Sequence, residues 1–198
     1  MKIYTASRSD KTFVVKILKA AFIDDPQINF IIGDGKNHQK KYDRLMSYAF
    51  EQATLNGHIE ISEDKNAVAI WRYFNSNKIS FRLLKENILF LLFFGFNGLK
   101  RVKTMEAEIQ KDYPKDRDFL YLWFLGTLPT HQGKGFGSAL LNPFIEKCNI
   151  EKKVIYLETS TVKNVEYYKY KGFEIYKKLL LGNESKTQIY LMRKNPLR

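Results

Sequence analysis

The sequence predicts a single α/β domain, and three observations support this fold class. The apolar run at residues 119–125 is typical of a strand buried on both faces, and it leads through a glycine-rich turn into a segment with helical spacing. Segments with strand and helix periodicity also alternate through the rest of the chain. The length of 198 residues lies within the usual range of one domain, which can bury about 70% of its unfolded surface. We therefore expect residues 1–198 to fold as one unit.

The first expected elements are a short strand and an amphipathic helix. Residues 2–5 form a plausible strand, and an apolar stripe at helical spacing follows through residues 13–22. This helix should end before Pro26, because proline biases the preceding residue towards an extended conformation. The carboxylates of Asp24 and Asp25 would then lie at the helix exit.

A second helix and an antiparallel strand pair are expected next. Apolar residues at helical spacing cover residues 38–56, and Asn56-Gly57 marks the end of that helix. Residues 58–62 and 67–73 have the composition of strands. The short polar turn between them predicts an antiparallel pair.

The segment 78–110 contains the most apolar part of the chain. Its uncharged run from Asn87 to Leu99 has 13 residues, fewer than the roughly 18 that a membrane span requires. Turn signals at residues 95–98 predict two helices separated by a break. A helix that is apolar on every face is normally buried, so we expect buried packing here. An apolar substrate channel is the first alternative, and association with a membrane surface is the second.

The glycine-rich turn after the buried strand has the features of an anion site. Gly133, Gly135 and Gly137 lie at the start of a predicted helix, whose first backbone N–H groups have no intrahelical partner. Without Cβ atoms at these positions, an anion can approach those groups. A dinucleotide fingerprint would require glycine at Ser138, and a P-loop would require Ser or Thr after Lys134, so neither motif fits. Two interpretations of the turn remain: a phosphate-binding loop of another kind, or a tight turn that binds no ligand.

The last elements are a strand, a helix and a hairpin. Residues 154–157 predict a buried strand, and residues 164–171 predict a short helix. Residues 173–181 and 188–193 predict a closing hairpin with its turn at residues 182–183.

Several motifs in this half of the chain occur in the order typical of one family. The turn resembles the Gln/Arg-x-x-Gly-x-Gly/Ala pyrophosphate loop of the GNAT superfamily of acyl-CoA-dependent N-acetyltransferases, and here it reads Gln132-Gly133-Lys134-Gly135-Phe136-Gly137. A later series resembles the branch that includes puromycin N-acetyltransferase, and it consists of Leu157-Glu158-Thr159-Ser160, Asn164, Tyr167-Tyr168 and Lys171-Gly172-Phe173. The matches span roughly residues 118–194, whereas the N-terminal half resembles the family only in general shape.

The resemblance implies a GNAT-like fold, in which a mixed central sheet has a splayed parallel strand pair and is flanked by helices. It implies acetyl-CoA as co-substrate, bound by residues 118–198, with residues 1–117 forming mainly the acceptor side. Backbone groups at the end of the buried strand would hold the pantetheine arm, and N–H groups of the glycine loop would hold the pyrophosphate. The cofactor-binding residues implied in this way are Leu125, Gly126, Thr127, Gln132, Gly133, Lys134, Gly135, Phe136, Gly137, Ser138 and Asn164.

Two side chains are candidates for proton transfer, which acyl transfer from a thioester to an amine requires. Tyr168 matches the tyrosine of the family's Phe-Tyr-x-x-x-Gly-Phe pattern, whose phenol can donate a proton to the thiolate; packing in the core is the alternative role. Glu158 ends a buried strand, where desolvation could raise its pKa and suit it to act as the general base. Asp24, Asp25 and His131 are rival bases, and the two aspartates are also candidates for binding a cationic amine.

The predicted function is transfer of an acetyl group from acetyl-CoA to the amine of a small molecule, by direct attack in a ternary complex. A non-catalytic acyl-CoA-binding or sensory module is the alternative. The net charge of +12 also permits nucleic-acid binding, but the 12 Lys and Arg residues of segment 147–198 are scattered, and coenzyme A is itself polyanionic. We expect a monomer or homodimer with neither a nucleic-acid nor a membrane partner.

Cysteine and histidine usage argues against a disulfide or a metal site. Cys148 is the single cysteine and lies on the apolar side of a predicted helix, so we expect it to be buried. The three histidines have no metal-ligand spacing. The first residues lack the apolar region of a signal peptide, and a cytoplasmic location is therefore expected.

Overall fold

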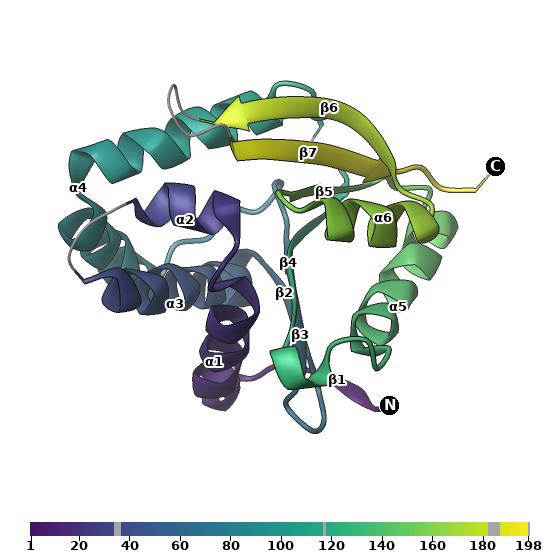
Figure 1. Cartoon of the computed structure of the whole chain (residues 1–198), viewed down its shortest axis with the longest axis horizontal. Helices are drawn as coiled ribbons and strands as arrows, with labels where there is room; N and C mark the ends of the chain where they lie inside the picture. Colours follow the sequence, from purple (N-terminus) through teal and green to yellow (C-terminus); the bar gives the residue numbers. More distant parts are fainter. Residues whose placement is uncertain (34–36, 117, 182–186, 198) are drawn as a thin grey trace.

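The computed structural model describes residues 1–33, 37–116, 118–181 and 187–197, which form a mixed sheet between two layers of helices (Figure 1). The helices are α1 (Lys11–Phe22), α2 (Pro26–Ile32), α3 (His38–Asn56), α4 (Phe81–Gln110), α5 (Phe136–Glu151) and α6 (Val162–Tyr170), with 3-10 turns at Arg8–Asp10 and Pro129–His131. The strands are β1 (Ile3–Thr5), β2 (Gly57–Ser62), β3 (Ala67–Arg72), β4 (Leu120–Thr127), β5 (Ile155–Thr159), β6 (Glu174–Leu181) and β7 (Thr187–Lys194).

The sheet contains one parallel strand pair, and this pair separates along its length. The strand order is β1-β2-β3-β4-β5-β7-β6, and every neighbouring pair is antiparallel except β4 and β5. The parallel register runs only from Leu120 opposite Ile155 to Leu122 opposite Leu157, although both strands continue further. The predicted splayed pair is therefore present, with its open end at the carboxyl ends of both strands.

A bulge on the other side of β4 adds to this irregularity. Ile70 pairs with Phe124 and Trp71 pairs with Leu122, so Trp123 has no opposite residue on β3. A bulge of this kind bends a strand and redirects a side chain.

Each face of the sheet has its own hydrophobic core. Helices α1 to α4 cover one face, and α5 and α6 cover the other (Figure 1). The first core includes Ile17, Tyr42 and Phe50, whereas the second includes the stacked rings of Trp71 and Phe144, whose centroids are 3.8 Å apart. Cys148 belongs to the second core and is fully buried, as predicted.

The helix α2 is an element that the sequence pattern did not reveal. The first helix ends as predicted, and Asp25 is extended with φ −70° and ψ 122°. A new helix of seven residues then begins at Pro26, with Asp25 as its N-cap. Proline at the first helical position is favourable, because its missing N–H would have no partner there. Seven residues are too few for a clear helical period.

The predicted break in segment 78–110 is present, but its burial was only partly predicted. Gly95 has φ 62° and ψ −176°, which interrupts α4. One side of α4 packs against the core through residues such as Phe90 and Met105. The opposite side is exposed, with Phe81 91% and Leu92 73% accessible, so the expectation of buried packing is wrong for these residues. No helix among the described residues is long and apolar enough to cross a membrane.

Most of the remaining predicted elements are confirmed within one to three residues at their ends. Helix α3 and the antiparallel pair β2–β3 match the expected ranges. The closing hairpin is formed by β6 and β7, and β7 inserts between β5 and β6. Its predicted turn at residues 182–183 lies outside the described residues.

Candidate active site

A cavity of about 390 Å³ lies at the point where β4 and β5 separate. Its walls come from α1, α2, α3 and α4 on one face of the sheet and from α6 on the other. Residues from both strands, including Leu125 and Glu158, complete the lining. The gap between the strands therefore allows side chains from opposite faces of the sheet to meet in one space.

Glu158 is the carboxylate at the centre of this arrangement. It lies on β5 just past the last residue that pairs with β4, and it lines the cavity. Its Oε2 atom is buried and has no hydrogen-bond partner among the described residues. Burial raises the pKa of Glu158 to about 7, an effect that the hydrogen bonds from Tyr121 and Gln27 only partly oppose. Glu158 can therefore exchange a proton near neutral pH.

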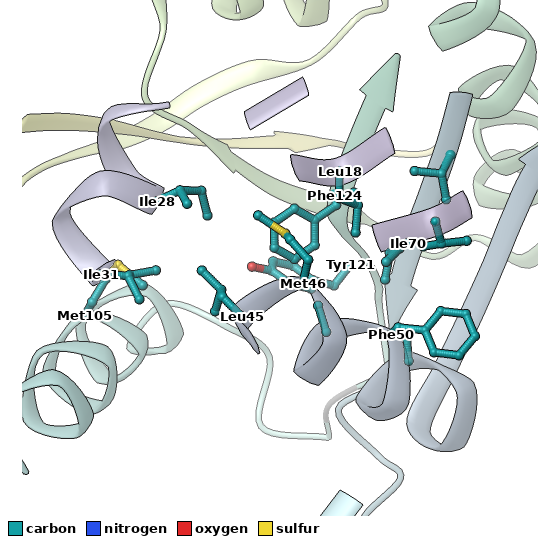
Figure 2. Packing of buried hydrophobic residues seen from close by; sticks show 14 of the residues in the cluster. Leu18, Ile28, Ile31, Leu45, Met46, Phe50, Ile70, Met105, Tyr121 and Phe124 are labelled. Atoms are coloured by element: carbon teal, nitrogen blue, oxygen red, sulfur yellow. The ribbon is translucent and has the colours of Figure 1, made fainter. Parts of the chain in front are cut away.

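Two polar side chains hold the other oxygen of this carboxylate. The Tyr121 hydroxyl donates to Glu158 Oε1 at 2.5 Å, and the Gln27 amide donates to the same atom at 3.5 Å. Figure 2 shows the phenol oxygen of Tyr121 directed towards the space bordered by Leu45 and Ile28. These contacts fix the orientation of the carboxylate, and Oε2 is the oxygen that has no partner among the described residues.

Asp25 has a structural role that connects α2 to β5. One carboxylate oxygen accepts a hydrogen bond from the Ile28 amide at 3.0 Å, and the other accepts from the Ser160 hydroxyl at 2.8 Å. Burial nevertheless raises its pKa. The link to Ser160 brings α2 across the end of β5 and so places Gln27 beside Glu158. Asp25 lines the cavity but both of its oxygens are engaged, whereas Asp24 is exposed and outside the cavity lining.

Tyr168 reaches the same cavity from α6. Its ring is 8% exposed and packs edge-on against Tyr167 and Phe173, with centroids 5.3 and 5.6 Å away. Burial raises the pKa of the Tyr168 phenol, and the nearby charge of Glu158 acts in the same direction. The phenol is therefore protonated at neutral pH and can act as a donor. Packing and proton donation, which the sequence left as alternatives, are compatible at this position.

The glycine-rich turn has the geometry of an anion cradle at the N-terminus of α5. Gly133 and Gly135 have φ values of 77° and 85°, which favour glycine, and a Cβ atom at either position would meet nothing within 4 Å. Gly135 is the N-cap of α5 and provides no side chain for the first amides of the helix. The exposed N–H groups and the open space above them together suit a phosphate.

The predicted cradle residues do not all face this open space. Gln132 and Lys134 are exposed, but the Phe136 side chain is buried in the core, so only its backbone is available. Gly137 lies close to Tyr167, because a Cβ there would be 3.3 Å from the phenol oxygen, and the Ser138 hydroxyl is 3.5 Å from the same oxygen.

The predicted pantetheine residues border the cavity and the cradle. Leu125 and Asn164 line the cavity beside Tyr168. Gly126 has a packing role in addition, since a Cβ there would lie 3.1 Å from Ala21 on α1. Thr127 ends β4 and pairs with Ala67.

His131 lies away from the cavity lining. Its Nδ1 is 2.9 Å from the Thr130 hydroxyl, and its ring packs edge-on against Phe136. Among the described residues, no group of three or more His, Cys, Asp or Glu side chains is placed to hold a metal ion.

An ion pair in the cavity was not anticipated from the sequence. Arg72 Nη1 lies 2.9 Å from Glu106 Oε1, and its guanidinium also lies over the ring of Trp123 with its carbon 5.3 Å from the centroid. Both charged residues line the cavity. Neither Arg72 nor Gln27 belongs to a recognisable motif. Tyr121 could have been recognised as a candidate site residue, because a hydroxyl within a buried apolar strand needs a polar partner.

Comparison with known proteins bears directly on this geometry. The family model described as "Acetyltransferase (GNAT) family" matches residues 94–173, which include the cradle, Glu158 and Tyr168. Residues 94–173 are therefore similar to the GNAT acetyltransferase family. An uncharacterized N-acetyltransferase of Schizosaccharomyces pombe is 24% identical to this chain over 189 residues, which is 89% of this chain and 76% of the yeast protein.

Solved structures show that the GNAT fold extends over the whole chain. The crystal structure of "histone acetyltransferase HPA2 and related acetyltransferase" from Corynebacterium glutamicum aligns with 100% of this chain and 97% of its own, with a TM-score of 0.69 and 21% identity. Arylalkylamine N-acetyltransferase 2 from Aedes aegypti aligns over 98% of each chain, with a TM-score of 0.66 and 15% identity. These likenesses confirm the predicted single-domain GNAT fold, including its divergent N-terminal half.

The residues of this chain fit the acyl-CoA that the GNAT family uses. The open glycine cradle is suited to the pyrophosphate, and the end of β4 that no longer pairs with β5 leads from the cavity lining towards this cradle. A thioester bound along this path would have its acyl end beside Glu158 and Tyr168.

Proposed function

We propose that this protein transfers an acetyl group from acetyl-CoA to the amine of a small molecule, by direct transfer in a ternary complex. The observation that carries the proposal is the convergence of Glu158 and Tyr168 on one cavity at the splayed end of β4. Residues 118–198 would provide the donor site, and residues 1–117 would provide most of the acceptor walls. The motif series at residues 157–173 supports a relationship to the branch that includes puromycin N-acetyltransferase.

The donor site would use mainly backbone groups. The N–H groups of residues 133–138 would bind the pyrophosphate at the N-terminus of α5, with Lys134 contributing charge and Gln132 flanking the loop. Leu125, Gly126 and Thr127 would hold the pantetheine arm, and Asn164 would border it from α6. The bound co-substrate supplies an activated acyl group on a sulfur atom.

Glu158 would serve as the general base. Its carboxylate accepts the proton that the amine loses as the amine nitrogen bonds to the acyl carbon. A pKa of about 7 suits this role, because a base works best when its pKa lies near the operating pH. Tyr121 and Gln27 orient the carboxylate, and Oε2 faces no competing donor among the described residues.

Tyr168 would serve as the general acid. Its phenol donates a proton to the sulfur as the carbon–sulfur bond breaks, so that the thiol leaves in neutral form. The raised pKa keeps the phenol protonated until that step. The two groups act on different atoms, which is consistent with one group on β5 and the other on α6.

The experiment is a steady-state assay of thiol release with acetyl-CoA and a panel of small amines. Product mass should increase by one acetyl group, and initial-rate lines at varied concentrations of both substrates should intersect, as a ternary complex requires. Parallel lines would indicate a covalent acetyl-enzyme and would contradict direct transfer. Binding of acetyl-CoA without turnover of any amine would instead support a non-catalytic acyl-CoA-binding module.

A further inference from the structure

Aromatic side chains dominate the acceptor end of the cavity. Tyr48, Phe90 and Trp123 all line it, with Tyr48 in contact with both of the others, and we call these three residues the aromatic wall. The ring of Tyr48 lies 5.7 Å from that of Phe90 and, edge-on, 6.3 Å from that of Trp123. Trp123 is the bulged residue of β4, so the same irregularity that disturbs the sheet also places this ring. The aromatic wall offers ring faces and edges to a ligand.

Two carboxylates of the described cavity lining, Asp25 and Glu106, are engaged by other protein groups. Arg72 and Glu106 pair with each other at 2.9 Å, and Asp25 is engaged by the Ile28 amide and Ser160. Within the described part of the lining, Glu158 is then the carboxylate that has a buried oxygen without a partner. Lys103 also lines the cavity but is exposed, and its charge disfavours a second cation.

From these observations we infer that the acceptor is a monoamine with an apolar, ring-bearing body and no carboxylate. The amino group lies at Glu158 and the ring lies against the aromatic wall. A second ammonium group would be buried without a counter-charge, which costs several kcal/mol. A carboxylate on the carbon that bears the amino group would lie beside the Glu158 carboxylate, and the two negative charges would repel each other. This inference rests on the proposed function, because it names the acceptor of that reaction.

The test compares three amines with acetyl-CoA as the donor: 2-phenylethylamine, phenylalanine and spermidine. Phenylalanine has the same ring with an added carboxylate, and spermidine has several amino groups and no ring. We expect kcat/KM for 2-phenylethylamine to exceed the other two by at least about tenfold, which corresponds to 1.4 kcal/mol. An equal or higher value for spermidine or phenylalanine would overturn the inference while leaving acetyl transfer itself intact.

Variants at Tyr48 test the aromatic wall. Tyr48→Leu removes a ring and should raise KM for 2-phenylethylamine about tenfold, with a much smaller change in kcat. Tyr48→Phe keeps the ring and should raise this KM much less than Tyr48→Leu does. Phe81→Leu is the matched control, because Phe81 is 91% exposed and outside the cavity lining. Equal KM values for Tyr48→Leu and Tyr48→Phe would contradict the inference.

Calorimetry separates this inference from the proposed function. Each amine is titrated into the unmodified protein saturated with coenzyme A, so that binding is measured without turnover. Tighter binding of 2-phenylethylamine than of spermidine supports the inference about the acceptor, whether or not any amine is acetylated. If no amine is acetylated, only the proposed function is refuted. Binding of spermidine with equal or higher affinity would overturn the inference, as would no detectable binding of 2-phenylethylamine.

Discussion

The environment of Glu158 opposes its ionisation, and this has consequences for both stability and chemistry. One carboxylate oxygen accepts hydrogen bonds from Tyr121 and Gln27, but the other is buried without a partner among the described residues. The pKa of about 7 lies above the ordinary value of 4.5. Between these two values the folded protein binds more protons than the unfolded chain, so its stability falls as the pH rises through this window.

Replacing Glu158 by Gln should therefore stabilise the fold at alkaline pH. The amide is neutral and keeps a similar shape, so Glu158→Gln should melt several degrees above the unmodified protein at pH 8, and this difference should shrink towards pH 4.5. Thermal unfolding at several pH values measures the effect. Glu146→Gln, at an exposed position, is the control and should melt like the unmodified protein. A lower melting temperature for Glu158→Gln at pH 8 would show that the carboxylate is favourably held.

Tyr168 is expected to affect turnover more than binding. Removing the hydroxyl with Tyr168→Phe should lower kcat about 10²-fold or more, because general acid catalysis contributes on that scale. The dissociation constant of coenzyme A should change little, since the ring and its packing are kept. Steady-state rates and calorimetry provide both values. Tyr170→Phe, at a residue 85% exposed, should leave the rate unchanged; an undiminished kcat in Tyr168→Phe would remove the proton-donor assignment.

At the scale of elements, the strand–turn–helix unit of β4 and α5 combines two features that anion binding requires. The turn exposes the first amides of a 16-residue helix, and the glycines keep the space above them open. Both Gly133 and Gly135 adopt positive φ values, in which a larger residue is strained. The glycines are thus needed for the conformation of the turn and also for access to it.

Gly135→Ala should weaken coenzyme A binding selectively. The added methyl strains the turn by about 1 kcal/mol and enters the cradle, so we expect a roughly tenfold higher dissociation constant. Gly95→Ala is a matched control, because Gly95 also has a positive φ and open space around it but lies in α4. It should lose similar stability and bind coenzyme A normally. If both variants bound coenzyme A equally well, the cradle would not be the phosphate site.

Elements with strong local signals were predictable, and those that depend on tertiary contacts were not. The cradle, the break at Gly95 and the α3–β2–β3 segment follow from glycine positions and hydrophobic period. Helix α2 was missed because it is short and is stabilised by Asp25, whose second oxygen is engaged by Ser160, which lies far along the chain. Large apolar residues lie on the exposed side of α4 as well as on its buried side, so the hydrophobic period alone could not distinguish the two sides.

At the scale of the whole molecule, the candidate active site lies where the pairing of β4 with β5 ends. Two layers of helices cover the sheet, and the separation of β4 from β5 connects them (Figure 1). Glu158 and Tyr168 could be predicted because they belong to a motif series in the C-terminal half. Gln27, Arg72 and Glu106 could not, because they come from separate elements of the divergent half and meet only in the folded cavity. The residues of the proposed donor side could therefore be named from sequence motifs, whereas the residues that line the proposed acceptor side were found only in the structure.

The pH dependence of amine-dependent thiol release, in the unmodified protein and in Glu158→Gln, tests the central claim most directly. If Glu158 is the base, kcat/KM of the unmodified protein should rise with pH and level off above about 7, where the carboxylate is ionised. The kcat/KM of Glu158→Gln should be lower by about 10²–10⁴-fold and should not show this rise with pH. An undiminished kcat/KM in the variant, or the same rise that levels off near pH 7, would show that Glu158 is not the base.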